Sequence, residues 1–367
     1  MDVRVLGSGS ASGIEEYTSN LLDNILNNNR DHEISLFYSG LKKRRLDYQV
    51  PIIDVLAPNK FIDLASRFSS WSPIDKKADV DVVFSPHFNI LNTASPRVIT
   101  FHDLSFLHHP YFFSAKQKVW HWLQDYRRQA RQASKIIAVS EFTKSDLINF
   151  LDVDPKKISV VYSGINQDFK KLPVDNHPLI EFKKRHNLNR PFFLYLGTLE
   201  PRKNVVGLIK AFDILKSNPT YKDFQLILAG KRGWLYRDII KTFNNSSHKK
   251  DIVFWGPVKT VDRIFLYNLA MAFVYPSFFE GFGFPPLEAQ ACGCPVITAD
   301  RTSLPEVIGS SGILIDPWRI ADLASAMAQI NDKTSLRQEI VQKGIKNSQR
   351  FNWTAAAKKT LNILANV

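Results

Sequence analysis

Short apolar runs alternate along the chain with longer segments in which apolar residues recur every three or four positions. The runs are typical of buried β-strands and the longer segments of amphipathic helices. The expected strands are 3–7, 33–40, 51–56, 81–86, 97–103 and 135–140, then 192–198, 224–231, 251–257, 271–277 and 294–300. The expected helices between them include 17–28, 141–151, 205–216, 261–270 and 318–330. Because such alternation favours parallel sheets covered by helices, we expect an α/β fold in which the series occurs twice.

A polar segment rich in Lys and Pro, 165–191, separates the two series and is expected to hold a linker and one helix. After the second series, 348–367 has the spacing of one last amphipathic helix. We therefore expect an N-terminal domain, 1–170, completed by the returning helix 351–367, and a C-terminal domain, 171–350. Each is expected to be a Rossmann-like, doubly wound domain, with the carboxyl ends of its strands facing a central cleft that binds ligand.

Composition narrows the class of protein. The hydrophobic content of 44% and charged content of 23% are ordinary for a globular chain of 367 residues and argue against disorder. The formal charge of +13 indicates an anionic partner, which could be a nucleic acid, an anionic membrane or a phosphorylated small molecule. Nucleic acid is disfavoured because no RRM, KH or helix-turn-helix pattern accompanies the charge.

The two cysteines, Cys292 and Cys294, have neither disulfide-framework nor CxxC spacing, and we expect buried thiols in a reducing compartment. The apolar part of the first residues is too short for a signal peptide, and no apolar run is long enough to span a membrane. A cytoplasmic location is therefore expected.

Three loops that follow expected strands carry candidate chemistry. The first, GSGSASG (7–13), precedes a helix as a phosphate-binding glycine turn does. Its last glycine stands at Gly13, whereas the dinucleotide fingerprint requires one at position 12. A substrate or phosphate loop, a plain turn and a dinucleotide site all remain open, the last being the weakest.

The second loop, GTLEPRKN (197–204), leads into the helix expected from Asn204 or Val205. Arg202 and Lys203 would then meet the free N–H groups and positive dipole end of a helix, which together favour a diphosphate. The simpler alternative is two solvated cations.

The third loop, EGFGFPPLE (280–288), places two glutamates around glycines and prolines. Gly281 and Gly283 permit close approach of a ligand to the backbone, and Pro286 suits the first turn of a helix, in which Glu288 is expected. Carboxylates are better suited to sugar hydroxyls than to phosphate, so Glu280 and Glu288 are expected to hold hydroxyls at two ends of one ligand.

The second and third loops together, 197–204 and 276–297, resemble the family-4 retaining glycosyltransferases of the GT-B fold, whose hallmark is two glutamates separated by seven residues. The resemblance extends over almost the whole chain and is closest to the mannosyltransferase-like branch that acts on cell-envelope polysaccharide. The further motifs that carry it are 84–90, 100–110, 136–147, 158–166, 229–234, 303–317 and 351–353.

The resemblance implies a role for each motif residue. Glu288 would hold the ribose hydroxyls and Glu280 the hydroxyls of the donor sugar, while Arg202 and Lys203 would bind and neutralise the departing diphosphate. His102, in TFHDLSF, would contact the sugar or the reacting centre.

The remaining implied contacts come from the backbone. Gly283, Phe284 and Pro285 would shape a nest for sugar and phosphate, and Gly13 would approach the donor from the first domain. Relatives commonly carry a different residue where this chain has Glu16, which leaves the acceptor side of the site less defined than the donor side.

The implied activity is transfer of a hexose, mannose from GDP-mannose, to a cell-envelope glycan or lipid-linked acceptor with retention of configuration. The nucleotide sugar is a co-substrate, and neither a cofactor nor a metal is implied. Two DxD triplets, Asp79/Asp81 and Asp152/Asp154, are interpreted as caps and turns. The alternatives are a UDP-sugar-dependent transferase, a GT-B nucleotide-sugar epimerase, a glycoside hydrolase and a non-catalytic nucleotide-sugar-binding module.

The segment 116–135 combines Trp120, Trp122 and Tyr126 with basic residues, and 41–46 is also basic. Both could rest on an anionic membrane, making the protein peripheral on the inner face of the cell membrane. The competing interpretation is a helix that packs its aromatic residues into the first domain and leaves its arginines in water.

Overall fold

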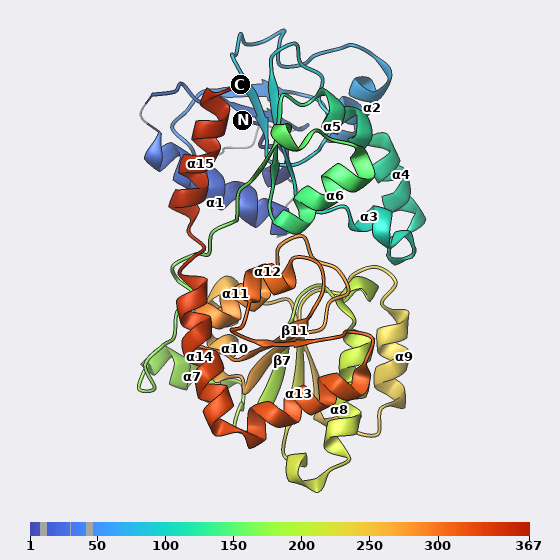
Figure 1. The fold of residues 1–367 in the computed structure, drawn as a ribbon, viewed down its shortest axis with the longest axis vertical. Coiled ribbons are helices and arrows are strands. Elements are labelled where there is room, and N and C mark those ends of the chain that lie inside the picture. The colour runs from blue at the N-terminus through green and yellow to red at the C-terminus, as the bar shows by residue number, and fades with distance from the viewer. Residues whose placement is uncertain (8–12, 30, 42–46) are drawn as a thin grey trace. The chain divides into compact units, whose positions relative to one another are not determined.

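The structure is a computed structural model that describes residues 1–7, 13–29, 31–41 and 47–367. It divides into two compact units (Figure 1). The N-terminal unit comprises Met1–Gly164 and Asn352–Val367, and the C-terminal unit comprises Ile165–Phe351. The chain thus changes unit at 164/165 and at 351/352, whereas the sequence analysis placed the boundaries at 170/171 and 350/351.

Parallel strands form the centre of the N-terminal unit. Four of them, β3 (Val83–Ser85), β4 (Arg97–Phe101), β5 (Lys135–Ala138) and β6 (Ile158–Val160), pair in that order, and β1 (Leu36–Ser39) pairs with β2 (Ile52–Val55). The first residues join the two sheets, because Asp2 N–H donates to Phe84 O (2.8 Å) and Val3 N–H to Phe37 O (2.9 Å). The helices are α1 (Gly13–Asn28), α2 (Asn59–Phe68), α3 (Ser105–His108), α4 (Ala115–Leu123), α5 (Tyr126–Gln132) and α6 (Glu141–Leu151).

The expected strand at 3–7 is wrong, because Arg4–Gly7 is a 3₁₀ helix and the preceding residues contribute only an isolated bridge from Asp2 to Phe37. Arg4 is almost fully buried, and its backbone N–H (3.1 Å) and guanidinium Nη2 (2.8 Å) both donate to the carboxylate of Asp2. Burial opposes ionisation of Asp2, but Arg4 outweighs it and holds the pKa of that carboxyl below its usual value. These local bonds replace the ladder that a continued strand would need.

The C-terminal unit contains a six-stranded parallel sheet in the order β12-β11-β10-β7-β8-β9. Its strands are β7 (Phe192–Leu196), β8 (Gln225–Ala229), β9 (Ile252–Gly256), β10 (Ala272–Tyr275), β11 (Val296–Ala299) and β12 (Ile313–Ile315). The helices are α7 (His177–Arg185), α8 (Val205–Lys216), α9 (Arg237–Asn245), α10 (Thr260–Leu269), α11 (Phe284–Ala291), α12 (Leu304–Ile308), α13 (Ile320–Asp332) and α14 (Thr334–Ser348). Cys292 and Cys294 are free and buried in the turn before β11, and burial raises the pKa of both thiols.

The chain returns to the N-terminal unit through α15 (Trp353–Ala365), which packs against α1 (Figure 1). Tyr17 of α1 meets the Trp353 ring edge-on at 5.6 Å. The expected single helix 348–367 is therefore wrong in one respect: α14 ends at Ser348, and a new helix begins at Trp353 with Asn352 as its side-chain cap. No helix within the described ranges is both long and apolar enough to cross a membrane.

Candidate active site

In the C-terminal unit the predicted cationic loop lies where β7 ends and α8 begins. Pro201–Lys203 forms a 3₁₀ turn, and Asn204 caps α8 in the left-handed region, with φ 54°. The Asn204 side chain accepts from Gly207 N–H (3.1 Å) and donates to Pro317 O (2.7 Å). Arg202 and Lys203 are thereby fixed directly before a helix N-terminus, as the sequence analysis expected.

Lys203 and Glu280 come from different loops and form a buried ion pair. Lys203 Nζ lies 2.5 Å from Glu280 Oε1 and donates to the Tyr275 hydroxyl at 2.8 Å. The two residues are only 8% and 7% exposed. Burial opposes the ionisation of Glu280, but Lys203 and then Arg202 outweigh it and hold the pKa of Glu280 below its usual value. Glu280 is thus a carboxylate, an acceptor for hydroxyl groups, at neutral pH.

The loop that carries Glu280 is tied down on both sides. Ser303 Oγ lies 2.9 Å from Glu280 O and 3.0 Å from Phe282 O and shares its one proton between these carbonyls, while Glu280 N–H donates to Thr302 Oγ1 (3.1 Å). Phe278 N–H donates to Arg202 O at 2.8 Å, which joins this loop directly to the cationic one. The two loops therefore form one rigid constellation.

Gly283 ends that loop and begins α11. Its φ of 108° is strained for any other residue, and a Cβ there would lie 2.8 Å from Leu304 Cδ2. Phe284 and Pro285 follow as the first helical residues. Because Pro285 and Pro286 lack an N–H, the backbone donors of a nest at this point are limited to the neighbouring amides, chiefly those of Gly283 and Phe284.

Glu288 is the fifth residue of α11 and so lies in its second turn, not in the first as expected. The helix begins earlier than the sequence analysis assumed, because the two prolines occupy its first turn. Arg263 Nη1 lies 3.1 Å from Glu288 Oε1, and the Tyr267 hydroxyl donates to Oε2 at 2.9 Å. Glu288 is 2% exposed, so its carboxylate is held in one orientation by a cation and a phenol.

Arg263 and Tyr267 were not predicted from the sequence. They stand four positions apart on α10, which places both on the same helical face. That spacing was a detectable signal, but nothing in the sequence showed that this face is turned toward Glu288.

His102 belongs to the N-terminal unit, directly after β4. Its Nε2 lies 2.8 Å from Pro86 O, and since a carbonyl only accepts, Nε2 carries the proton. Burial lowers the pKa of His102, partly offset by the Pro86 bond, so the ring is neutral at pH 7 and its Nδ1 is an acceptor. His87 stacks beside it at 5.9 Å and is also held neutral, because burial and then His102 lower the pKa of His87 to about 3.

Gly13 is the first residue of α1 and is exposed, and a Cβ built on it would meet no atom within 4 Å. The rest of the glycine loop, 8–12, lies outside the described residues. Of the predicted site residues, Gly13 and His102 thus belong to the N-terminal unit and the others to the C-terminal unit. The second DxD triplet caps local turns as expected, with Asp152 ending α6 and Asp154 capping the 3₁₀ turn that follows.

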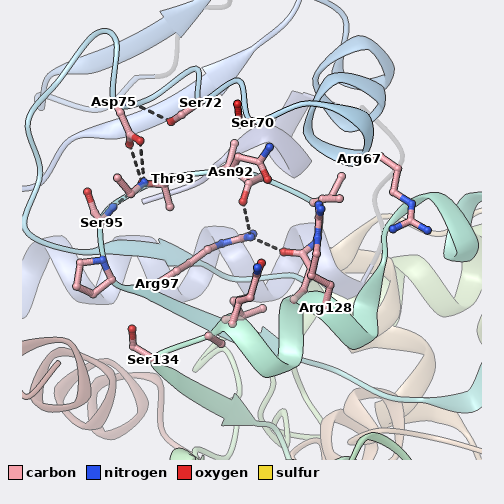
Figure 2. Close-up of a pocket in the computed structure, with 18 of the residues that line it drawn as sticks. Arg67, Ser70, Ser72, Asp75, Asn92, Thr93, Ser95, Arg97, Arg128 and Ser134 are labelled. Atoms are coloured by element: carbon pink, nitrogen blue, oxygen red, sulfur yellow. Dashed lines mark hydrogen bonds between the residues drawn. The ribbon is translucent and has the colours of Figure 1, made fainter.

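The N-terminal unit contains a polar cavity of about 1030 Å³ (Figure 2). It opens at the amino ends of β4 and β5, near Arg97 and Ser134, whereas His102 follows the carboxyl end of β4. Among the described residues, none of the predicted site residues lines it.

Comparison with known proteins defines first the fold and then the family. Solved structures that share the architecture over nearly the whole chain include a glycosyltransferase from Rickettsia africae, with a TM-score of 0.73, 20% identity and coverage of 98% of this chain and 96% of that one. Another is HepE of Anabaena in complex with UDP and glucose, with a TM-score of 0.72, 17% identity and coverage of 98% of both chains. The fold is GT-B, built from two Rossmann-like domains with parallel sheets.

Residues 11–169 match the family described as Glycosyltransferase Family 4, and residues 176–347 match Glycosyl transferases group 1. The O-antigen chain mannosyltransferase B of Escherichia coli is 31% identical over 301 residues, which are 82% of this chain and 77% of that protein. The chain belongs to glycosyltransferase family 4 and is a glycosyltransferase.

Proposed function

We propose that this glycosyltransferase moves a hexose, mannose from GDP-mannose, to a hydroxyl of a cell-envelope glycan or lipid-linked oligosaccharide, with retention of configuration and without a metal. The observation that carries the proposal is the buried Lys203–Glu280 pair beside Arg202 at the N-terminus of α8. The choice of mannose is supported by the similarity to the O-antigen chain mannosyltransferase B.

In this proposal the cationic loop binds the leaving group. Cleavage of the bond between the anomeric carbon and the diphosphate oxygen develops negative charge on the diphosphate. Arg202, Lys203 and the positive end of α8 are already fixed where that charge would develop, so little reorganisation is required. Losing one such contact typically costs about 2.7–4 kcal/mol of transition-state stabilisation.

The two carboxylates have separate tasks. Glu280 accepts hydrogen bonds from the hydroxyls of the donor sugar, beside the cations that hold the diphosphate. Glu288 accepts from the ribose hydroxyls while Arg263 and Tyr267 keep it oriented. His102, neutral and with its Nδ1 accepting, is suited to a sugar hydroxyl that donates a hydrogen bond and cannot act there as a proton donor.

Transfer with retention is proposed to follow front-side attack. The bond from the anomeric carbon to the diphosphate oxygen breaks, the bond to the acceptor oxygen forms on the same face, and the departing phosphate oxygen takes the acceptor proton. Glu280 is already paired with Lys203, which disfavours it as a covalent nucleophile. Atoms and charge balance without a further reactant.

A UDP-sugar donor is the second candidate, because HepE shares the fold and its structure holds UDP and glucose. An epimerase of this fold would convert a nucleotide sugar with no acceptor present, and a binding module would not turn it over at all. These alternatives differ in what they do with donor alone.

The test is a panel of GDP-mannose, GDP-fucose, UDP-glucose, UDP-galactose and UDP-N-acetylglucosamine, with and without EDTA. A bound donor stabilises the folded state, so the cognate one should raise the melting temperature and release its nucleoside diphosphate in the presence of EDTA. Lys203→Met should abolish release, while Lys210→Met, which replaces an exposed lysine on the following helix α8, should not. If the protein responded selectively to a UDP-sugar, that UDP-sugar would replace GDP-mannose as the assigned donor. No response to any nucleotide sugar would overturn the proposal.

A further inference from the structure

Helix α2 presents apolar side chains on both of its faces. Its inner face buries Ile62, and its outer face exposes Phe61, Leu64 and Phe68, which are 55%, 51% and 67% exposed. Spacings of three and four place these three side chains on one stripe. A stripe of large apolar residues turned to water is unfavourable unless another surface covers it.

Helix α4 adjoins α2 (Figure 1). Its Val119 and Trp122 are 63% and 57% exposed, and the Phe68 and Trp122 rings lie 6.3 Å apart. The Arg67 guanidinium lies over the Trp122 ring at 5.2 Å. We call Phe61, Leu64, Phe68, Val119 and Trp122 the α2–α4 surface.

The structure corrects which residues of 116–135 are available to a membrane. Trp120 packs inward against Phe88 (5.9 Å) and Tyr126 against Phe106 (4.8 Å), so of the three aromatics only Trp122 is exposed. Helix α2, which the sequence analysis did not single out, supplies three of the five apolar side chains instead. The basic segment 42–46 lies outside the described residues.

The two segments that carry this surface are rich in basic residues. Residues 56–77 and 115–131 contain nine Lys and Arg against three Asp. The aspartates are engaged within the protein: Asp63 with Arg4, Asp125 with Arg67, and Asp75 with Thr93. Lys60, Lys116 and Lys118 are exposed beside the apolar stripe.

We propose that the α2–α4 surface binds an anionic lipid bilayer. Apolar side chains that enter the boundary between headgroups and acyl chains, with lysines around them that reach the lipid phosphates, are the arrangement of an interfacial helix. Lysine is depleted in protein–protein interfaces, so a lysine rim favours lipid over a protein partner.

The cavity of Figure 2 borders the same surface. Arg67 and Phe68, at the end of α2, line it together with Arg128, Asn92 and Thr93. The apolar stripe therefore ends against polar and cationic groups, which suit headgroups rather than acyl chains.

The experiment is co-sedimentation of the full chain with phosphatidylcholine vesicles, with or without a third of phosphatidylglycerol. No nucleotide sugar is added, so the result is independent of the proposed activity. The wild type should bind the anionic vesicles and be released by high salt. Replacing both Phe61 and Phe68 with serine should lower the partition coefficient at least about tenfold, because both exposed rings leave the bilayer boundary.

Two matched controls identify the surface. The variant Val174→Ser, Ile214→Ser removes two exposed apolar residues of the C-terminal unit and should bind like the wild type. Lys116→Glu, Lys118→Glu should lose binding, whereas Lys358→Glu, Lys359→Glu, an exposed pair on α15, should retain it.

Three outcomes would overturn the proposal. They are undiminished sedimentation of the Phe61, Phe68 variant, equal binding to neutral vesicles, and a lipid-free wild-type dimer that this variant converts to monomer. The last would assign the surface to a second copy of the chain. An unchanged circular dichroism spectrum and an unchanged melting temperature for every variant would show that each is folded.

Discussion

Lys203 and Glu280 depend on each other, because each is buried and neutralised by its partner. Glu280→Gln and Lys203→Met should each lower kcat/KM at least about 100-fold, since each removes a group that we place on the donor. Steady-state nucleotide release measures this. Normal turnover in either variant would contradict the site.

The same ion pair should also affect the free energy of unfolding, and differently in the single and the double variants. Removing one partner leaves a buried charge without its counter-ion, which typically costs about 3–5 kcal/mol, whereas replacing both partners costs less. Lys203→Met should therefore unfold at lower urea concentration than the double variant Lys203→Met, Glu280→Gln. Equal or additive losses would show that the two side chains do not interact.

His87 predicts how stability changes with pH. Its pKa is about 3 in the folded protein because of burial and then His102, against about 6.5 in an unfolded chain. As pH falls below about 6.5, the unfolded chain therefore binds a proton at His87 that the folded protein does not bind. The free energy of unfolding then drops by about 1.4 kcal/mol per pH unit. Urea titrations in this range should give a shallower slope for His87→Phe, and an unchanged slope would contradict the neutral assignment.

At this scale the sequence predicted which loops the structure brings together around Glu280, Arg202 and Lys203. Glu280, Arg202 and Lys203 lie in loops that contain glycine or proline and follow apolar strands. This local pattern is visible in a single sequence. Arg263 was missed because its role depends on which face of α10 meets α11, and that is decided by packing across distant parts of the chain.

Among the elements, α8 adjoins the proposed donor site through its cap, Asn204. Asn204→Ala should lower the free energy of unfolding by about 1 kcal/mol, since the Gly207 N–H loses its acceptor. It should also weaken donor binding, because Arg202 and Lys203 directly precede this cap. The matched control is Asn352→Ala, which removes the cap of α15 and should reduce stability alone. Calorimetric titration of both variants with donor separates the two effects; equal donor affinity in both would contradict the link.

Element boundaries were predictable where a sharp signal exists. The helix expected at 205–216 is α8 with the same bounds, because Asn204 and the preceding Pro mark its start. Strands β6 and β12 were not among the strands expected from the sequence. Each has only three residues, which are too few to form a periodic pattern. The break between α14 and α15 was hidden because 348–367 continues an amphipathic spacing, although Phe351 is buried in one unit and Trp353 in the other.

On the scale of the whole molecule, the return of the chain depends on a small residue at the crossing point. A Cβ on Gly164 would lie 2.2 Å from the backbone N of Trp353, which begins α15. Gly164→Ala should therefore displace α15 from α1 and cost about 1–3 kcal/mol or more. Gly13→Ala, where the Cβ meets nothing, is the control. Limited proteolysis should release a C-terminal fragment only from the Gly164 variant, and equal resistance would contradict this packing.

The duplicated α/β series predicted two domains from the sequence alone, because buried parallel strands are apolar along their length. Which apolar side chains reach the surface was not predictable in the same way. The net charge of +13 is a property of the whole sequence, whereas the exposure of Phe61, Leu64 and Phe68 follows only from the way α2 packs.

The central claim is that Glu280 holds the donor sugar and Glu288 the nucleoside, and calorimetric titration with GDP and with GDP-mannose tests it most directly. Glu280→Gln should bind GDP at least as tightly as the wild type but lose the additional affinity for GDP-mannose. Glu288→Gln should weaken both ligands by the same factor. If Glu280→Gln weakened GDP as much as GDP-mannose, or if neither variant changed either affinity, the assignment of the two carboxylates would be wrong.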